Sequence, residues 1–534
     1  MSRKIIFLIL LCGLVKTSFS QSNLLWSETY TANMHSSSYS PSNYLDQDTL
    51  VSTGVKQTSN GTKLVQLKHD LNGQLLSEIV YGNELAFASS IVAYQFHDDF
   101  VYLLCREQIN STSESNIVMQ KYDKMGLLLT SFIIPLVGDT SFYPGKFSIT
   151  NEGNYLIFIA KNYYVPGEDM DDIWGDVYNF LYSFSPNGDK LWERSLQEIP
   201  AIKSLIYGSS FINDTTYIAI HQGGFPYRIL RVSPDNEITS MAHPNMYGAG
   251  NIQAANDGNL LLTGAQHFRL TKMTQNGTVL WTTSDFQAEF PNNDNSVINY
   301  TKQDAQGNIY MTGAYDEDDG DTLQYKVLTL KYDMYGNLLW SQKYSSSRFD
   351  EGQTIQLKNG FVYIGGQSQQ SEDTYSSYDH LVLKIDATTG ALVGDYKYRS
   401  SESTSIFDNN YDNVTSLAIT DEGNVALIGI EDNESDGYNW LIQYISDLTL
   451  STSNVNLNSF HCYPNPVNSG DDFHLNGEAL ISVAIYSPEG KLLKDGEITG
   501  SDMPTISTAG MKSGLYLVKV HSKTVDSTIK LVVR

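Results

Sequence analysis

Cysteine is scarce in this 534-residue sequence, which holds only Cys12, Cys105 and Cys462. Cys12 falls in a leader segment and the other two lie far apart in the chain, so we expect no framework of disulfide bonds. Stability must then come from packing of the apolar residues, which make up 41% of the chain. Cys105 ends the apolar run VYLLC, and we expect it to be a small buried side chain rather than a reactive thiol.

Long apolar runs are also lacking, because beyond the N-terminus no stretch approaches the ~20 apolar residues of a membrane-spanning helix. The apolar run at residues 5–15 is shorter; it follows Arg3 and Lys4 and is followed by small residues up to Ser20. That order is typical of a secretory signal peptide, so we predict that residues 1–20 are removed. The mature chain is then expected to have no transmembrane segment.

Positive charge is the third scarcity, with 34 Lys and Arg against 60 Asp and Glu and a net charge of −26. Residues 1–20 carry +3 and residues 446–534 carry −2, so the part between them carries −27. Such a surface repels nucleic acid and anionic membranes, so we expect no nucleic-acid partner. Solubility of an exported protein explains the charge most simply; cation binding and adaptation to salt are alternatives.

Proline is scarce too, with 14 residues, whereas tyrosine and phenylalanine are abundant, with 35 and 21. Aromatic side chains suit the pleated surface of a sheet, so the composition favours β structure. One sequence pattern, which we call the phrase, recurs along the chain. It consists of an alternating apolar run, a short turn of Asp, Asn and Gly, and a second alternating run that often reads Leu-Leu-Trp. This pattern predicts a β-hairpin. Seven copies begin at Leu64, Ile117, Phe180, Tyr227, Phe268, Leu328 and Leu381.

A further strand precedes most copies, as in NDGNLLLTGA from residue 256 and DEGNVALIGI from residue 421. Its terminal glycine, such as Gly264, Gly313 or Gly429, indicates a place where the backbone crowds a neighbour. Each repeat therefore supplies three or four strands, which is the content of a propeller blade.

An eighth copy begins at Trp440 but lacks the turn and the second run, and NLLWSETY at residues 23–30 supplies that missing run. Pairing it into the last blade would remove an exposed edge. We therefore predict an all-β fold with an eight-bladed β-propeller at residues 21–448, closed by the N-terminal strand; seven blades are the alternative. We expect the Leu and Trp positions of the phrase to pack between blades, including the tryptophans at the same offset, Trp192, Trp281 and Trp340.

The recurring patterns G-N-x-hydrophobic-x-x-G and D-x-x-G-x-L-L-W resemble the quinoprotein-like (PQQ-like, delta-60) repeats of bacterial β-propellers. The resemblance implies an architecture rather than an activity. Quinoprotein dehydrogenases of that superfamily use an Asp base, a metal-bound cofactor and often two adjacent cysteines. This chain has no adjacent cysteines, so we do not expect PQQ, or any other cofactor, to be bound.

The amino-acid composition of the chain changes after Asp447. Residues 449–459 are uncharged and rich in Ser, Asn and Thr, which predicts a linker, and the short alternating runs of residues 460–534 predict a small Ig-like β-sandwich. This segment resembles the type A C-terminal sorting domain of the type IX secretion system of Bacteroidota. The positions that carry the resemblance are Tyr463, Pro464, Asn465, Pro466, Gly490 in IYSPEGKLL, Gly514 and Tyr516 in SGLYLVKV, and Lys530.

This resemblance implies export through the periplasm to the cell surface or the medium, with the type IX secretion machinery as partner. An adhesive domain that stays attached is the alternative. Whether the product is released or anchored stays open at this point.

The sequence holds no H-E-x-x-H, G-x-S-x-G, P-loop or C-x-x-C motif, so we predict no catalytic residue. Two kinds of segment are candidate binding sites. The insertion at residues 161–180 mixes acids with rings that could stack on sugars, namely Tyr163, Tyr164, Trp174 and Tyr178, and residues 371–380 resemble it. The run DEDDGD clusters the oxygens that calcium prefers, on Asp316, Asp318, Asp319 and Asp321.

These features favour an exported binding scaffold for an extracellular glycan or protein. A secreted enzyme that degrades polysaccharide or peptide in the propeller funnel is the main alternative. A purely structural surface protein is the third hypothesis.

Overall fold

The computed structural model is all-β in the residues that it describes. These are residues 24–448 and 461–534, without 35–39, 83–87, 109–114, 136–140, 163–176, 196–205, 213–214, 223–224, 234, 236, 243–250, 265–267, 284–295, 317–323, 372–373, 399–411, 434–436, 464, 477–479, 488–490, 498–503 and 523–525. The chain separates into two compact units, residues 1–449 and 450–534. Within the described segments, no helix is long and apolar enough to cross a membrane.

In the residues that the structure describes, the first unit contains eight groups of four antiparallel strands, which we call sheets and number in chain order, although the first two share one eight-stranded sheet. The first four groups are β2 (Ser42–Asp46), β3 (Thr49–Thr58), β4 (Gly61–Asp70) and β5 (Leu75–Tyr81); β6 (Ala88–His97), β7 (Phe100–Gln108), β8 (Asn116–Asp123) and β9 (Leu128–Ile133); β10 (Ser141–Ile149), β11 (Tyr155–Asn162), β12 (Val177–Phe184) and β13 (Lys190–Ser195); and β14 (Ile206–Ile212), β15 (Thr215–Gln222), β16 (Phe225–Val232) and β17 (Ile238–Ala242).

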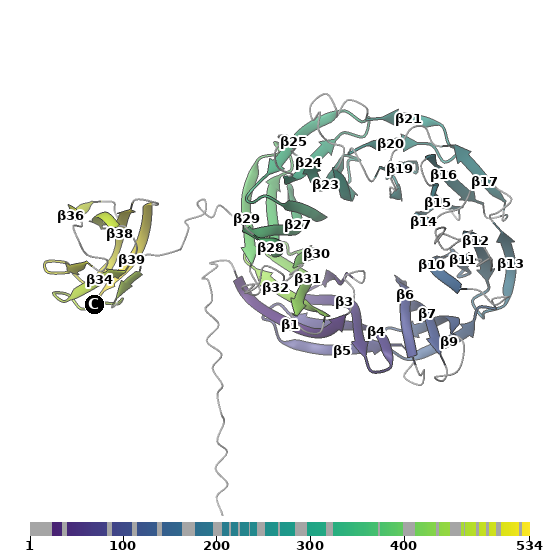
Figure 1. The fold of residues 1–534 in the computed structure, drawn as a ribbon, viewed down its shortest axis with the longest axis horizontal. Helices are drawn as coiled ribbons and strands as arrows, with labels where there is room; N and C mark the ends of the chain where they lie inside the picture. The colour runs from purple at the N-terminus through teal and green to yellow at the C-terminus, as the bar shows by residue number, and fades with distance from the viewer. Residues whose placement is uncertain are drawn as a thin grey trace, which may run out of the picture. The chain divides into compact units, whose positions relative to one another are not determined.

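The fifth to eighth groups are β18 (Ile252–Ala254), β19 (Leu260–Thr263), β20 (Leu270–Met273) and β21 (Val279–Thr282); β22 (Val297–Gln303), β23 (Ile309–Asp316), β24 (Tyr325–Tyr332) and β25 (Leu338–Tyr344); β26 (Asp350–Lys358), β27 (Phe361–Ser371), β28 (Thr374–Asp386) and β29 (Leu392–Tyr398); and β30 (Asn413–Ile419), β31 (Val425–Asn433), β32 (Gly437–Ile445) and β1 (Leu24–Met34). The first and second groups are joined by a single bridge between Gly61 and Ser89. Figure 1 shows the groups following one another around a ring, with β9, β13, β17 and β21 on its outside.

The turns between the third and fourth strands at Asp70, Asp123 and Asp333 follow the Asp-x-x-Gly pattern of the sequence, and hydroxyls of Ser185 and Thr274 replace the carboxylate in two others. In the first sheet, an oxygen of Asp70 accepts the N–H groups of Asn72 and Gln74 at 2.9 and 2.8 Å. Gly73 has a φ of 87°, a conformation that glycine adopts without steric cost. The turn residues therefore determine where each hairpin reverses.

Buried apolar clusters join each of the eight sheets to the next one, and the eighth to the first. Neighbouring sheets meet through Leu64 and Val101, Leu104 and Ile157, Phe158 and Leu230, Tyr217 and Leu260, Leu270 and Leu328, Trp340 and Ile364, Val382 and Leu427, and Trp440 and Leu64. Burial of apolar surface between sheets, at roughly 25 cal/mol per Å², is the main stabilising contribution here.

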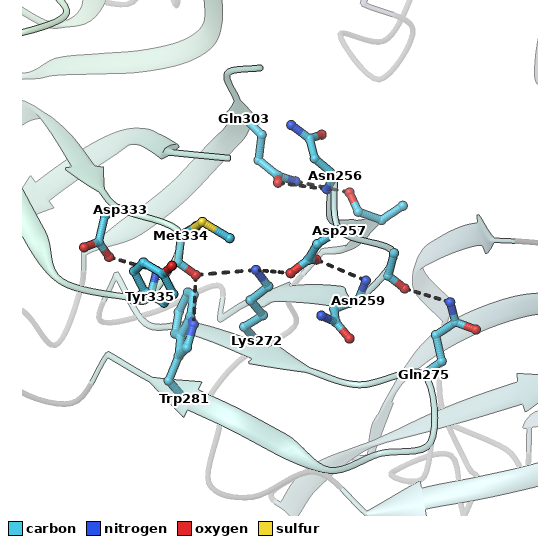
Figure 2. A network of polar contacts seen from close by, with 12 residues as sticks. Asn256, Asp257, Asn259, Lys272, Gln275, Trp281, Gln303, Asp333, Met334 and Tyr335 are labelled. Atoms are coloured by element: carbon cyan, nitrogen blue, oxygen red, sulfur yellow. Dashed lines mark hydrogen bonds and ion pairs between the residues drawn. The ribbon is translucent and has the colours of Figure 1, made fainter. Parts of the chain in front are cut away.

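The tryptophan of the repeated phrase packs on the turn of the following sheet. Trp281 in β21 donates from Nε1 to the carbonyl oxygen of Met334 at 3.2 Å. Its ring lies against Gly336, where a Cβ would come within 2.8 Å of the indole. Figure 2 shows this contact together with Lys272, whose Nζ lies 2.7 Å from an oxygen of Asp257 and also reaches the Met334 carbonyl.

The same contact recurs in the sixth and eighth sheets. Trp340 donates to the carbonyl oxygen of Ala387 at 3.1 Å, and Trp26 donates to that of Leu71 at 3.1 Å. Trp26 belongs to β1, which pairs antiparallel with β32 so that Tyr30 lies opposite Trp440. The leading strand thus contributes both a fourth strand to the eighth sheet and the tryptophan that contacts the first sheet.

The prediction for the leucines of the phrase is wrong at its second leucine. That residue is 46–54% exposed at Leu25, Leu76, Leu129, Leu191, Leu280 and Leu339. Successive side chains of a strand point to opposite faces, so a tryptophan that faces the next sheet turns the preceding leucine outward.

Two smaller predictions are confirmed. A Cβ on Gly313 would lie 1.9 Å from the carbonyl oxygen of Val297, and one on Gly429 would lie 2.2 Å from that of Asn413, so both glycines are crowded by backbone. Cys105 is fully buried, and burial raises the pKa of its thiol well above the ordinary value.

Two sheets are present in the described part of the second unit. One pairs β33 (His461–Tyr463), β34 (Asp472–Asn476) and β37 (Thr505–Ser507). The other has the order β36 (Leu492–Glu497), β35 (Leu480–Tyr486), β38 (Gly514–Ser522) and β39 (Asp526–Val533). Their shared core includes Phe473 and Leu475 from the first sheet and Ile485, Val518 and Leu531 from the second.

Candidate functional site

The topology of the first unit brings the long connections to one face. In a four-stranded antiparallel sheet, the connection between the second and third strands lies at the end of the sheet where the first strand begins and the fourth strand ends. We call this end the loop face; its connections run up to 14 residues, as at residues 163–176 and 399–412. At the opposite end the connections have two to five residues. Variable chemistry is therefore concentrated on the loop face.

The segments predicted to bind ligands all connect second and third strands and so belong to the loop face. Residues 163–176 join β11 to β12, residues 317–324 join β23 to β24, and residues 372–373 join β27 to β28. Tyr163, Tyr164 and Trp174 lie outside the described residues, as do Asp318, Asp319 and Asp321. The backbone of Tyr178 belongs to β12, but its side chain is outside the description.

Asp316 is the one residue of the acidic run that the structure describes. It is buried at the end of β23, where its N–H donates to the hydroxyl of Ser296 at 3.0 Å. Among the described residues no group of three His, Cys, Asp or Glu side chains is arranged to hold a metal ion. The calcium site stays a prediction.

A buried carboxyl group at the loop face was not predicted from the sequence. Glu351 is the second residue of β26, and its two oxygens accept hydrogen bonds from Asn299 Nδ2 at 2.7 Å and Gln367 Nε2 at 2.9 Å. Part of the residue is exposed, but its carboxyl group is enclosed by protein. Burial raises the pKa of Glu351 above its ordinary value, against the opposing hydrogen bonds.

All of these partners are side-chain amides, which do not act as general acids or bases. Asn299 Nδ2 also donates to the carbonyl oxygen of Gly352 at 2.8 Å, so the contact joins the sixth sheet to the seventh. We interpret it as a structural contact between sheets. No local pattern announces it, because Asn299 and Glu351 are 52 residues apart.

In the second unit, the predicted sorting motif surrounds the last strand of the chain. Asn465 Nδ2 donates to the carbonyl oxygen of Lys530 at 2.6 Å, and the N–H of Val532 donates to Asn465 Oδ1 at 2.9 Å. Val467 continues this contact by donating to the Val532 carbonyl and accepting from the N–H of Arg534. The segment that follows Asn465 therefore fixes the end of β39 from its open edge.

The other motif positions are distributed as follows. Tyr516 is buried on β38 and donates its hydroxyl hydrogen to the carbonyl oxygen of Lys512 at 2.7 Å, while Lys530 is exposed. Gly514 begins β38, and Pro466 follows Asn465 through a cis peptide bond. The side chain of Tyr463 and all of Pro464 and Gly490 lie outside the described residues.

Residues 461–534 match the family described as "Secretion system C-terminal sorting domain". The second unit is therefore a sorting domain, and its presence implies export to the cell surface or the medium by type IX secretion. No curated protein matches the chain.

Several solved structures resemble the chain at low identity. Virginiamycin B lyase from Staphylococcus aureus is 12% identical over 68% of this chain and 97% of its own, with a TM-score of 0.38. The polysaccharide lyase Uly1 is 12% identical over 70% and 93%, with a TM-score of 0.36. YCF48 bound to D1 peptide is 11% identical over 71% and 96%, with a TM-score of 0.35. At these scores the likenesses support no statement about function.

Proposed function

We propose that this chain is an exported binding scaffold, in which residues 24–448 form a closed eight-bladed β-propeller of the quinoprotein-like type. The match of residues 461–534 to a sorting domain is the observation that carries the export half of this proposal. The pairing of β1 with β32 and the apolar clusters between successive sheets support the closed ring. The C-terminal unit, an Ig-like β-sandwich, then serves as the export signal.

The route begins with cleavage of the signal peptide after residue 20 and folding in the periplasm. The sorting domain then engages the type IX secretion machinery of a Bacteroidota cell, and the product is released or anchored at the surface. Folding before transfer is compatible with the structure, because the first and last strands of the propeller must meet in one sheet.

The loop face is the proposed binding surface, with an extracellular glycan or protein as ligand. Rings of Tyr163, Tyr164, Trp174 and Tyr178 would stack on the apolar faces of sugars while nearby acids accept hydroxyl hydrogen bonds. Calcium held by the acidic run that starts at Asp316 would order the neighbouring connection. No observation on the described residues favours the degradative alternative.

Two measurements test this proposal. Deleting residues 461–534 should leave the protein in the periplasm, and recovery of the deleted form outside the cell would contradict the route. The purified propeller should bind members of a glycan and peptide array, and Trp174→Ala should weaken that binding by about tenfold or more, as loss of a stacking ring does. Absence of binding to every array member would favour the purely structural hypothesis.

A further inference from the structure

Three separate motifs of the sorting domain share one face of one sheet. The segment IYSPEGKLL contributes β35 and β36, SGLYLVKV contributes β38, and the chain end contributes β39. These strands form the sheet ordered β36-β35-β38-β39. Motifs that are up to about 45 residues apart in the chain are thereby neighbours in space.

Only the motif residues on the inner face of this sheet belong to the hydrophobic core. Val518 and Val520 on β38 and Leu531 and Val533 on β39 are buried against the other sheet. The residues between them point outward, because side chains alternate along a strand. The core therefore does not explain why outward positions such as Leu515 and Val532 are apolar.

The outward face carries a continuous apolar band. Leu515 is 42% exposed and lies opposite Val532, which is 38% exposed. The next row places Leu492, 46% exposed, opposite Tyr486, and Tyr486 opposite Leu517. Singly scattered exposed leucines are ordinary, but an apolar band across several strands indicates a contact surface.

Positive charge flanks this band. Lys530 lies opposite Leu517 on β39, and Lys519 lies two residues beyond Leu517 on the same outward side of β38. Among the acids whose side chains the structure describes, Asp495 on the edge strand β36 shares this side. Two outward lysines beside an apolar band are complementary to a partner that carries carboxylates next to an apolar strip.

We propose that this outward face, formed by Tyr486, Leu492, Leu515, Leu517, Val532 and Lys530, is the surface through which the sorting domain binds a protein of the export machinery. The partner presents an apolar strip flanked by carboxylates. The family match supplies the occupant, since a sorting domain must be recognised by that machinery. This inference rests on the proposed export route and specifies the surface that the route uses.

Asn465 is a positioning residue for this face. Its side chain bonds the backbone of Lys530 and Val532, the two β39 residues that point into the band. Asn465 therefore fixes the position of the edge strand β39 without itself belonging to the apolar band.

The experiment measures the exported fraction of the full chain in a host that has this secretion system. Leu515→Glu and Val532→Glu place a charge in the band, and Ala509→Glu places the same charge on an exposed turn of the same domain. Lys530→Glu and its control Lys512→Glu reverse exposed charges without touching the core. The deletion of residues 461–534 is compared in parallel, and thermal unfolding of each purified chain reports folding.

We expect Leu515→Glu, Val532→Glu and Lys530→Glu to lower the exported fraction by about tenfold or more, with thermal unfolding unchanged and both controls exported like the wild type. Wild-type export of these three variants, with the deleted form retained, would overturn the docking face but leave the export route intact. Export of the deleted form would instead refute the route itself. If a glutamate variant in the band unfolds, the exported fraction of Lys530→Glu compared with that of Lys512→Glu tests the docking face. Equal export of these two variants would then overturn it.

Discussion

Trp26→Ala is the substitution that most directly perturbs the contact between the last and first sheets. The indole donates to the carbonyl oxygen of Leu71 at 3.1 Å and lies against Gly73, where a Cβ would come within 2.9 Å of the ring. A fully buried aromatic side chain cut to alanine costs about 3–5 kcal/mol. Trp26 is half-buried, so we expect about 2 kcal/mol from packing, and its hydrogen bond adds about 1 kcal/mol.

Urea denaturation of the purified mature chain measures this loss of about 3 kcal/mol. Trp26→Phe should recover the packing but not the hydrogen bond, and so should lose about 1 kcal/mol. Leu25→Ala is the matched control: Leu25 is 54% exposed on the same strand and should change stability by less than about 0.5 kcal/mol. Equal denaturation midpoints for Trp26→Ala and Leu25→Ala would refute the reasoning.

Three further predictions follow from individual contacts. Gly313→Ala should destabilise the propeller by more than about 2 kcal/mol in urea denaturation, because its Cβ would meet backbone at 1.9 Å, whereas Gly496→Ala meets nothing within 4 Å and should be neutral. Burial lowers the pKa of His380 to about 4, so the neutral ring is favoured in the folded state and stability should fall as pH drops from 6.5 to 4, by about 3 kcal/mol. His380→Gln should flatten that pH dependence, and an unchanged profile would contradict the assignment. Asn465→Ala should lower the melting temperature of the sorting domain through a loss of about 1 kcal/mol, because it removes two hydrogen bonds to the backbone of β39, while Asn468→Ala, which loses one contact with Asp471 three residues away, should not.

Repeats and turns could be predicted from the sequence because their causes are local. The Asp70 carboxylate and the positive φ of Gly73 act within one turn, and the same residue types recur in the turns at Asp123 and Asp333. The contact of Trp281 and Trp340 with neighbouring sheets was predictable from their constant offset. The outward direction of the preceding leucine was missed, although alternation along a strand dictates it once the tryptophan is placed.

The pairing of residues 23–30 with the Trp440 segment was predictable because the two ends complete one repeat, but contacts between single side chains of distant segments were not. Glu351 meets Asn299 across two sheets, and Asn465 meets Lys530 across 65 residues, so neither pair leaves a spacing signal in the chain. The grouping of the candidate binding segments on the loop face also required the strand order. Their individual aromatic residues, such as Trp174, stay predictions from composition.

Hydrogen exchange along β1 tests the central claim most directly, namely that the leading strand closes the ring. Residues 24–34 pair with β32 and contact the first sheet through Trp26, so their amides should exchange as slowly as those of β32 and become exposed together with them. Exchange of these amides at the rate of an unstructured peptide, while β32 and the first sheet stay protected, would contradict the account.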